Sequence, residues 1–208
     1  MEVLRRQTNW EELYFYQKSK ALYQLTYIFS KRYLYRGDRT IDQMVQAARS
    51  GKQNIVEGSA DGVTSTAMEI NLINVARSSI KEVKEDYEDY LTSRRLTIWK
   101  EGHPRYEKMV DFCRTHNKLE DYQPYFEKWN DEELANVALS LCHFIDRMMV
   151  SYEQRLQKEF VEEGGIKERM TAARLGYRTN QKEEITRLQE ENLRLQEELE
   201  LLRKNNPR

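Results

Sequence analysis

The feature that most constrains this sequence is the scarcity of residues that break a helix. Only three prolines and eight glycines occur in 208 residues, and the stretch 66–96 contains neither. Proline and glycine mark most turns, so a many-stranded sandwich or barrel would need many more of them. The sequence therefore predicts an all-α fold of long helices.

The charge balance restricts the surface. Charged residues make up 33% of the chain and hydrophobic residues 39%, which is typical of amphipathic helices with solvated outer faces. With 34 basic and 35 acidic residues, the formal net charge is -1. This balance argues against a nucleic-acid-binding surface that covers the whole protein, although it leaves room for a local basic patch.

The expected compartment is the cytoplasm. Cys113 and Cys142 are too few for a disulfide framework, which favours a reducing environment. The first residues, MEVLRRQTNWEELY, lack the apolar stretch of a signal peptide. No window approaches the roughly 18 apolar residues of a membrane span, so we expect no membrane association.

Four segments carry apolar residues at three- and four-residue spacing, which predicts helices at about 9–35, 38–58, 66–96 and 130–163. Short connections between long helices favour antiparallel neighbours. The prediction is an antiparallel up-down four-helix bundle over residues 1–163. Residues at about 97–130, with two prolines and two tryptophans, are expected to form an inserted helical connection.

Polar residues at the predicted helix starts indicate N-caps. Asp38 is expected to cap the second helix. Thr66 with Glu69, and Asn130 with Glu133, have the spacing of capping boxes at the third and fourth helices.

Small side chains predict close contact between the second and third helices, since they shorten the interaxial distance. They are Ala47, Ala48, Ser50, Gly51, Ala76, Ser78 and Ser79. Glu57 is expected to pair with Arg77, and Asn54 to bond to the start of the third helix.

The C-terminal part is expected to comprise a short suffix segment at 164–180 and a coiled-coil tail at 181–208. Positions a of the heptads are Ile185, Asn192 and Leu199, and positions d are Leu188, Leu195 and Leu202. A lone asparagine at position a favours a parallel dimer. The alternative is a solvated single helix.

Two segments carry a family resemblance. QAARSGKQNIVEG at 46–58 and LINVARSSIKEV at 72–83 resemble the paired signatures of the S23-type four-helix bundle proteins, first described as products of intervening sequences in bacterial 23S rRNA genes. The chain is also similar to the accessory variability determinants of diversity-generating retroelements. EEGGIKERMTAARLGYR at 162–178 resembles the suffix domain of longer relatives.

The resemblance implies a homo-oligomer, commonly a pentamer. It also implies, for the retroelement relatives, binding to a reverse transcriptase and to nucleic acid through basic surface.

No pattern for catalysis, a cofactor or a metal site emerges. Cys113-x-x-His116 and the adjacent Cys142 and His143 suggest zinc only weakly, because neighbouring helical residues point about 100° apart. No histidine follows a glutamate by three residues, as di-iron bundles require, and no Gly-rich phosphate loop occurs. We expect a protein that is not an enzyme.

Two basic stretches are candidate contacts for nucleic acid or an acidic partner. The first surrounds Trp99 and Tyr106 and comprises Arg94, Arg95, Lys100, Arg105 and Lys108. Basic residues interleaved with aromatics suit stacking on single-stranded bases, although the aromatics could instead anchor the insertion. The second stretch comprises Lys167, Arg169, Arg174 and Arg178.

The expected function is a homo-oligomeric scaffold or adaptor that presents its surface and tail to a protein partner. The alternative is a nucleic-acid-binding accessory protein. Only the alternative predicts salt-sensitive binding of RNA or DNA.

Overall fold

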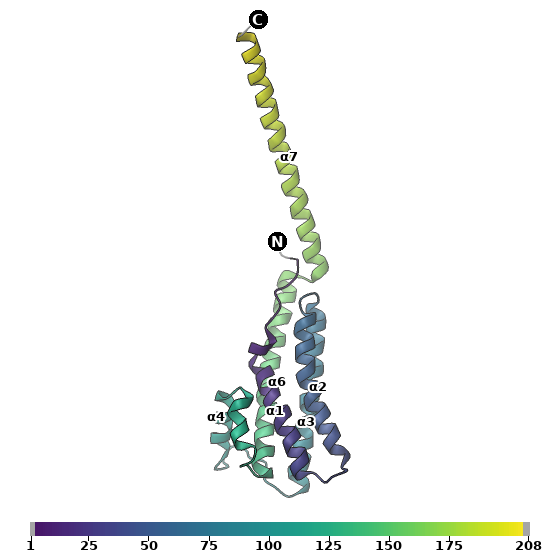
Figure 1. The fold of residues 1–208 in the computed structure, drawn as a ribbon, viewed down its shortest axis with the longest axis vertical. Coiled ribbons are helices and arrows are strands. Elements are labelled where there is room, and N and C mark those ends of the chain that lie inside the picture. The colour runs from purple at the N-terminus through teal and green to yellow at the C-terminus, as the bar shows by residue number, and fades with distance from the viewer. Residues whose placement is uncertain (1–2, 206–208) are drawn as a thin grey trace. The chain divides into compact units, whose positions relative to one another are not determined.

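The computed structural model describes residues 3–205, and the remaining five residues of the predicted bundle and tail lie outside it (Figure 1). The described residues contain helices and no strand, which confirms the all-α fold. The elements are η1 (Trp10–Glu12), α1 (Tyr14–Tyr33), α2 (Arg39–Asp61), α3 (Thr66–Ser93), α4 (Tyr106–Thr115), α5 (Leu119–Tyr122), η2 (Gln123–Tyr125), α6 (Asp131–Glu163) and α7 (Ile166–Asn205).

Residues 5–162 form one compact unit. In it α1, α2, α3 and α6 make the predicted bundle, with consecutive long helices running side by side (Figure 1). Their apolar stripes meet in a single core. Fully buried members include Leu22, Leu25, Phe29, Met44, Ile55, Ile80, Tyr87, Leu91, Leu134, Leu141 and Ile145.

Two of the predicted N-caps are confirmed. The Asp38 carboxylate accepts a hydrogen bond from the Thr40 amide at 2.9 Å. Asn130 and Glu133 form a reciprocal capping box: the Asn130 amide donates to the Glu133 carboxylate at 3.0 Å, and the Glu133 amide to the Asn130 side chain at 2.9 Å.

The capping box predicted at Thr66 is wrong. Ser65 is the N-cap, and its hydroxyl accepts from the Met68 amide at 3.1 Å. Glu69 lies inside the bundle, where it accepts from the Arg5 guanidinium at 2.7 Å. Because Arg5 supplies a counter-charge, Glu69 can be buried and is not needed at the helix end.

Helices α2 and α3 pack closely, as the small residues predict. A Cβ on Gly51 would lie 2.8 Å from Cδ1 of Ile80. The Ser79 hydroxyl donates to the Ser50 hydroxyl at 3.1 Å.

Both polar contacts predicted beside this interface are wrong. Arg77 forms ion pairs with Asp146 and Glu153 of α6, both at 2.9 Å, because it lies on the flank of α3 that faces α6. Asn54 bonds within its own helix, to the Ser50 carbonyl at 2.9 Å.

A buried lysine holds the insertion on the bundle. Lys18 of α1 is fully buried, and its ammonium donates to the carbonyls of Cys113 and, at 2.6 Å, His116. These carbonyls lie at the C-terminal end of α4, where a cation is favourable. Lys18 therefore stabilises the end of α4.

The second unit comprises residues 3–4 and 163–205. The predicted suffix segment and tail belong to one continuous helix, α7. Among the described residues, no helix is long and apolar enough to cross a membrane.

Candidate functional site

Two of the basic residues predicted around the insertion, Arg94 and Arg105, already make contacts within the protein. The Arg94 guanidinium lies 4.4 Å from the centroid of the Tyr90 ring and donates to the Tyr33 carbonyl at 3.2 Å. Arg105 forms an ion pair with Glu133 at 2.6 Å. A phosphate or carboxylate ligand would have to compete with these contacts.

The aromatic residues of the same stretch pack on the bundle. Trp99 is buried, and its indole N–H donates to Glu132 at 2.9 Å. Tyr106 is half-buried against the core. Neither ring is free for base stacking. Arg95, Lys100 and Lys108 are exposed.

The second predicted basic stretch lies at the start of α7. The Arg169 guanidinium donates to the Val3 carbonyl at 3.1 Å and to the Gly164 carbonyl at 3.0 Å. These bonds tie the start of α7 to the N-terminal segment of the same unit. Lys167, Arg174 and Arg178 are exposed.

The predicted coiled-coil residues form an unpartnered apolar stripe on α7. Asn192 is exposed within it. The apolar members, each more than half exposed, are Ile185, Leu188, Leu195, Leu199 and Leu202. A single copy of the chain leaves this stripe open to water.

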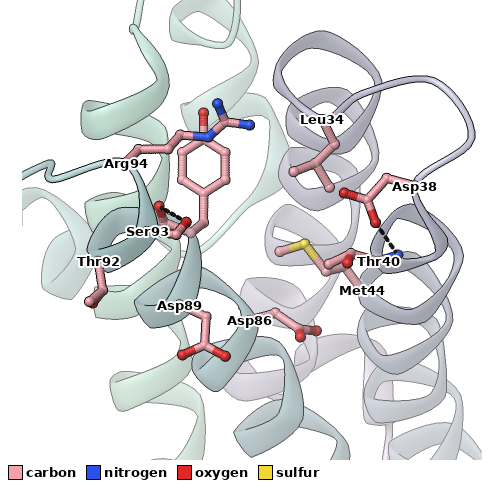
Figure 2. Close-up of a pocket in the computed structure, with 10 residues that line it drawn as sticks. Leu34, Asp38, Thr40, Met44, Asp86, Asp89, Thr92, Ser93 and Arg94 are labelled. Carbon is pink, nitrogen blue, oxygen red and sulfur yellow. Dashed lines mark hydrogen bonds between the residues drawn. The ribbon is translucent and has the colours of Figure 1, made fainter.

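Carboxylates gather in the groove between α2 and α3. Two hollows of about 520 and 660 Å³ share Asp86 and Asp89 of α3. Figure 2 shows Asp86 directed toward α2, with Asp38 and Met44 on the facing wall. We define the acidic groove by the four carboxylates that line the larger hollow, which are Glu82, Glu85, Asp86 and Asp89.

The carboxylates of the acidic groove form no ion pair in the described part of the chain, and Arg94 lines only the adjoining hollow. Among the described residues, none of the four carboxylates lies within 4.0 Å of a lysine or arginine nitrogen. Burial raises the pKa of Asp86 to about 6, and repulsion from Asp89, Glu82 and Glu85 adds to this effect. The groove would therefore gain from a cationic ligand.

The opposite flank of α2 carries the reverse charge. The Lys52 ammonium lies 4.7 Å from the centroid of the Tyr23 ring on α1. Burial lowers the pKa of Lys52, and so does repulsion from Arg49 and Lys20. We define the basic flank as Lys20, Tyr23, Arg49 and Lys52. None of its three cations has a carboxylate oxygen within 4.0 Å among the described residues.

The acidic groove lies between α2 and α3, whereas the basic flank lies between α2 and α1. Gln43 and Ser50 line the acidic groove. Lys52 faces α1, where its ammonium lies over the Tyr23 ring, and Arg49 is exposed and near enough to Lys52 to lower its pKa. The basic flank is not apparent along the chain because it draws residues from α1 and α2, whereas the four carboxylates of the acidic groove all come from α3. A helical wheel of α2 would have shown the basic side.

The cysteines do not form a metal centre. Cys113 and Cys142 are buried, and burial raises the pKa of Cys113 to about 12. In the part of the chain that the structure describes, no three His, Cys, Asp or Glu side chains are placed to hold a metal ion.

Comparison with protein-family models, with curated proteins and with solved structures finds no match.

Proposed function

We propose that the protein is a self-assembling helical scaffold in which the basic flank of one copy joins the acidic groove of the next. The observation that carries the proposal is the opposite charge of the basic flank and the acidic groove. Like charges without partners are unfavourable on each surface, and pairing between copies would relieve both. The resemblance to ring-forming bundles is in line with this proposal.

The contact would be heterologous, since different surfaces of two copies meet. After one contact forms, one copy still has a free basic flank and the other a free acidic groove. The contact can therefore repeat, which produces a ring or a filament. Such an assembly presents many copies of the remaining surface and of α7 to a protein partner. The exposed stripe on α7 offers a second contact, as a coiled coil of tails.

The pH dependence of assembly follows from Asp86, because burial raises the pKa of this residue to about 6. A basic partner would stabilise the carboxylate and lower this pKa, so assembly releases a proton. Assembly should therefore strengthen as the pH rises from about 5 to about 7. The other charged groups around Asp86 are the three acidic neighbours on α3, Asp38 at the start of α2, and Arg94.

The test is light scattering after size-exclusion chromatography at low and high salt. We expect a discrete assembly at about 50 mM salt that loses mass at about 500 mM, because salt screens exposed charges. Arg49→Glu with Lys52→Glu should prevent assembly. Lys128→Glu with Lys182→Glu, at two exposed positions outside both charged surfaces, is the charge-matched control and should leave the mass unchanged. Assembly by the first variant equal to that of the control would refute the proposal.

A second candidate function is single-stranded nucleic-acid binding by the basic flank. One turn beyond Tyr23, Tyr27 is exposed, and the Lys31 ammonium lies 4.2 Å from its ring. Tyrosines between cations suit stacked bases and phosphates. Binding of labelled single-stranded RNA that falls steeply with salt, and is lost in Arg49→Glu with Lys52→Glu, would favour this candidate.

A further inference from the structure

A second groove runs along the outer side of α6 and differs in character from the charged flanks of α2. One part is a hollow of about 630 Å³ between the start of α1 and α6, floored by Phe144 and Met148. An adjoining hollow of about 410 Å³ lies between α4 and α6. Both share Phe144 and Arg147, so the groove follows α6 from Asn136 to Arg155. At 1.5 Å per residue this length is about 28 Å.

The floor and walls of this groove leave apolar surface open. Phe144 and Met148 are only partly buried, and so is Leu13 on the α1 side. Tyr14 is 60% exposed although it stands in the apolar pattern of α1. Exposed apolar surface of this kind, with a polar rim, marks an interaction site.

Three arginines line the groove, namely Arg114, Arg147 and Arg155. Arg147 has no carboxylate oxygen within 4.0 Å among the described residues. Arg155 is exposed, and its pair with Glu159 is long, at 3.7 Å. Arg114 pairs with Asp111 on its own helix, and both side chains are exposed.

The acidic residues in the groove do not balance these arginines. Glu12, in the larger hollow, accepts from the Asn9 side chain at 2.8 Å. Glu88, in the smaller one, pairs with Lys84. An apolar floor with cationic edges favours a ligand that is apolar along one face and carries carboxylates beside it.

We propose that the α6 groove binds an acidic amphipathic helix of a partner protein. Its apolar residues, at i, i+3, i+4 and i+7, would cover Phe144 and Met148, and its carboxylates would pair with Arg147 and Arg155. A groove of about 28 Å along a helix suits a helix of about five turns. This inference deepens the proposed scaffold function, on which it rests, by giving the chemistry of the partner.

The test uses the full chain and a fluorescein-labelled peptide of about 20 residues, with leucine at positions i, i+3 and i+4 of each seven-residue repeat and glutamate elsewhere. We expect saturable binding in fluorescence anisotropy. The same peptide with lysine for every glutamate should not bind. A peptide of the same composition with the leucines scattered around the helix should bind at least tenfold more weakly.

Substitutions in the chain test whether the peptide binds in the α6 groove. Arg147→Glu with Arg155→Glu should weaken binding at least tenfold, whereas Lys128→Glu with Lys182→Glu, at exposed positions that do not line the groove, should not. Circular dichroism confirms that the variants fold, and Arg147→Lys with Arg155→Lys should retain part of the affinity. Equal binding by both glutamate variants, or equal binding of the scattered peptide, would overturn the proposal.

Light scattering separates a partner site from a contact between copies. If the peptide binds and lowers the mass of the assembly, the groove is occupied by a second copy and the proposal is wrong. Failure of the scaffold function is distinguishable, because that function depends on Arg49, Lys52, Asp86 and Asp89 and not on the arginines of this groove.

Discussion

At the residue scale, Lys18 shows how a buried charge sets a pH dependence. Burial lowers its pKa to about 8, while the carbonyls of Cys113 and His116 accept from its ammonium. In the unfolded chain its pKa is near 10.5. Between about pH 8 and pH 10.5 the unfolded chain binds more protons, so this residue adds stability as the pH rises.

The first prediction compares the wild type with Lys18→Met. The free energy of unfolding of the wild type, relative to the variant, should rise by about 2 kcal/mol between pH 7 and pH 10. Both proteins contain the same buried tyrosines and cysteines, so the titration of these residues cancels in the difference between the two free energies of unfolding. Urea unfolding at several pH values measures it, and parallel curves for the two proteins would show that Lys18 does not titrate as described.

Arg95 gives a second residue-scale prediction. It has a φ of 58°, and the Leu96 amide bonds to the Leu91 carbonyl, as in a Schellman motif at the end of α3. Glycine adopts this conformation without strain. Arg95→Gly should therefore raise the stability by about 1 kcal/mol. Arg94→Gly, at a φ of -94°, is the matched control and should not stabilise.

Local residue roles could be predicted from the sequence, and distant ones could not. Asp38 and Asn130 act within three residues of their own position, so their pattern is visible in the chain. Glu69 depends on Arg5, 64 residues away, and Lys18 on carbonyls nearly a hundred residues away. Only the fold brings these groups together.

At the element scale, the glycines of α2 set the distance to α3. A methyl group at Gly51 would meet the Ile80 side chain at 2.8 Å. Overpacking costs about 1–3 kcal/mol, which outweighs the roughly 1 kcal/mol that alanine gains over glycine in a helix.

The third prediction is thus that Gly51→Ala destabilises the bundle by about 1 kcal/mol. Ile80→Val removes the obstructing methyl, so Gly51→Ala should be less harmful in that background. Gly176→Ala in α7, where nothing lies within 4 Å, is the control and should increase helix content. An equal effect of Gly51→Ala in both backgrounds would show that Ile80 is not the obstacle.

The helices themselves could be predicted because apolar periodicity over twenty or more residues is a strong signal. Their ends are set partly by tertiary packing, which the sequence does not reveal. The sequence predicts that the second helix ends near Gly58, but α2 continues to Asp61. Gly58 does not cap the helix because it packs against α3, where an added Cβ would lie 3.3 Å from the Leu72 side chain.

At the scale of the whole molecule, the candidate surfaces depend on how the helices are arranged. The basic stretch predicted around Trp99 follows the chain, whereas the basic flank combines residues of α1 and α2, and the carboxylates of the acidic groove lie on α3 but face uncharged residues of α2. Charge on neighbouring helices cannot be assigned to one surface before their order in the bundle is known.

The fourth prediction concerns α7. A chain truncated after Asn180 lacks the apolar stripe from Ile185 to Leu202. If the flanks of α2 drive assembly, the truncated chain should keep the salt-sensitive assembly with a weaker affinity, because the tails add avidity only. Loss of all assembly on truncation, at protein concentrations where the full chain assembles, would assign the driving contact to the tail.

The most direct test of assembly through α2 is a mixing experiment with two variants, followed by light scattering. One variant carries Arg49→Glu and Lys52→Glu, and the other Glu82→Lys, Glu85→Lys and Asp89→Lys, which makes the net charge of the groove positive. Each alone places like charges on both surfaces and should remain monomeric. When the two are mixed, every flank meets a groove of opposite charge, so assembly should return, with copies of the two variants alternating. A mixture that stays monomeric, or a single variant that assembles like the wild type, would contradict assembly through the flanks of α2.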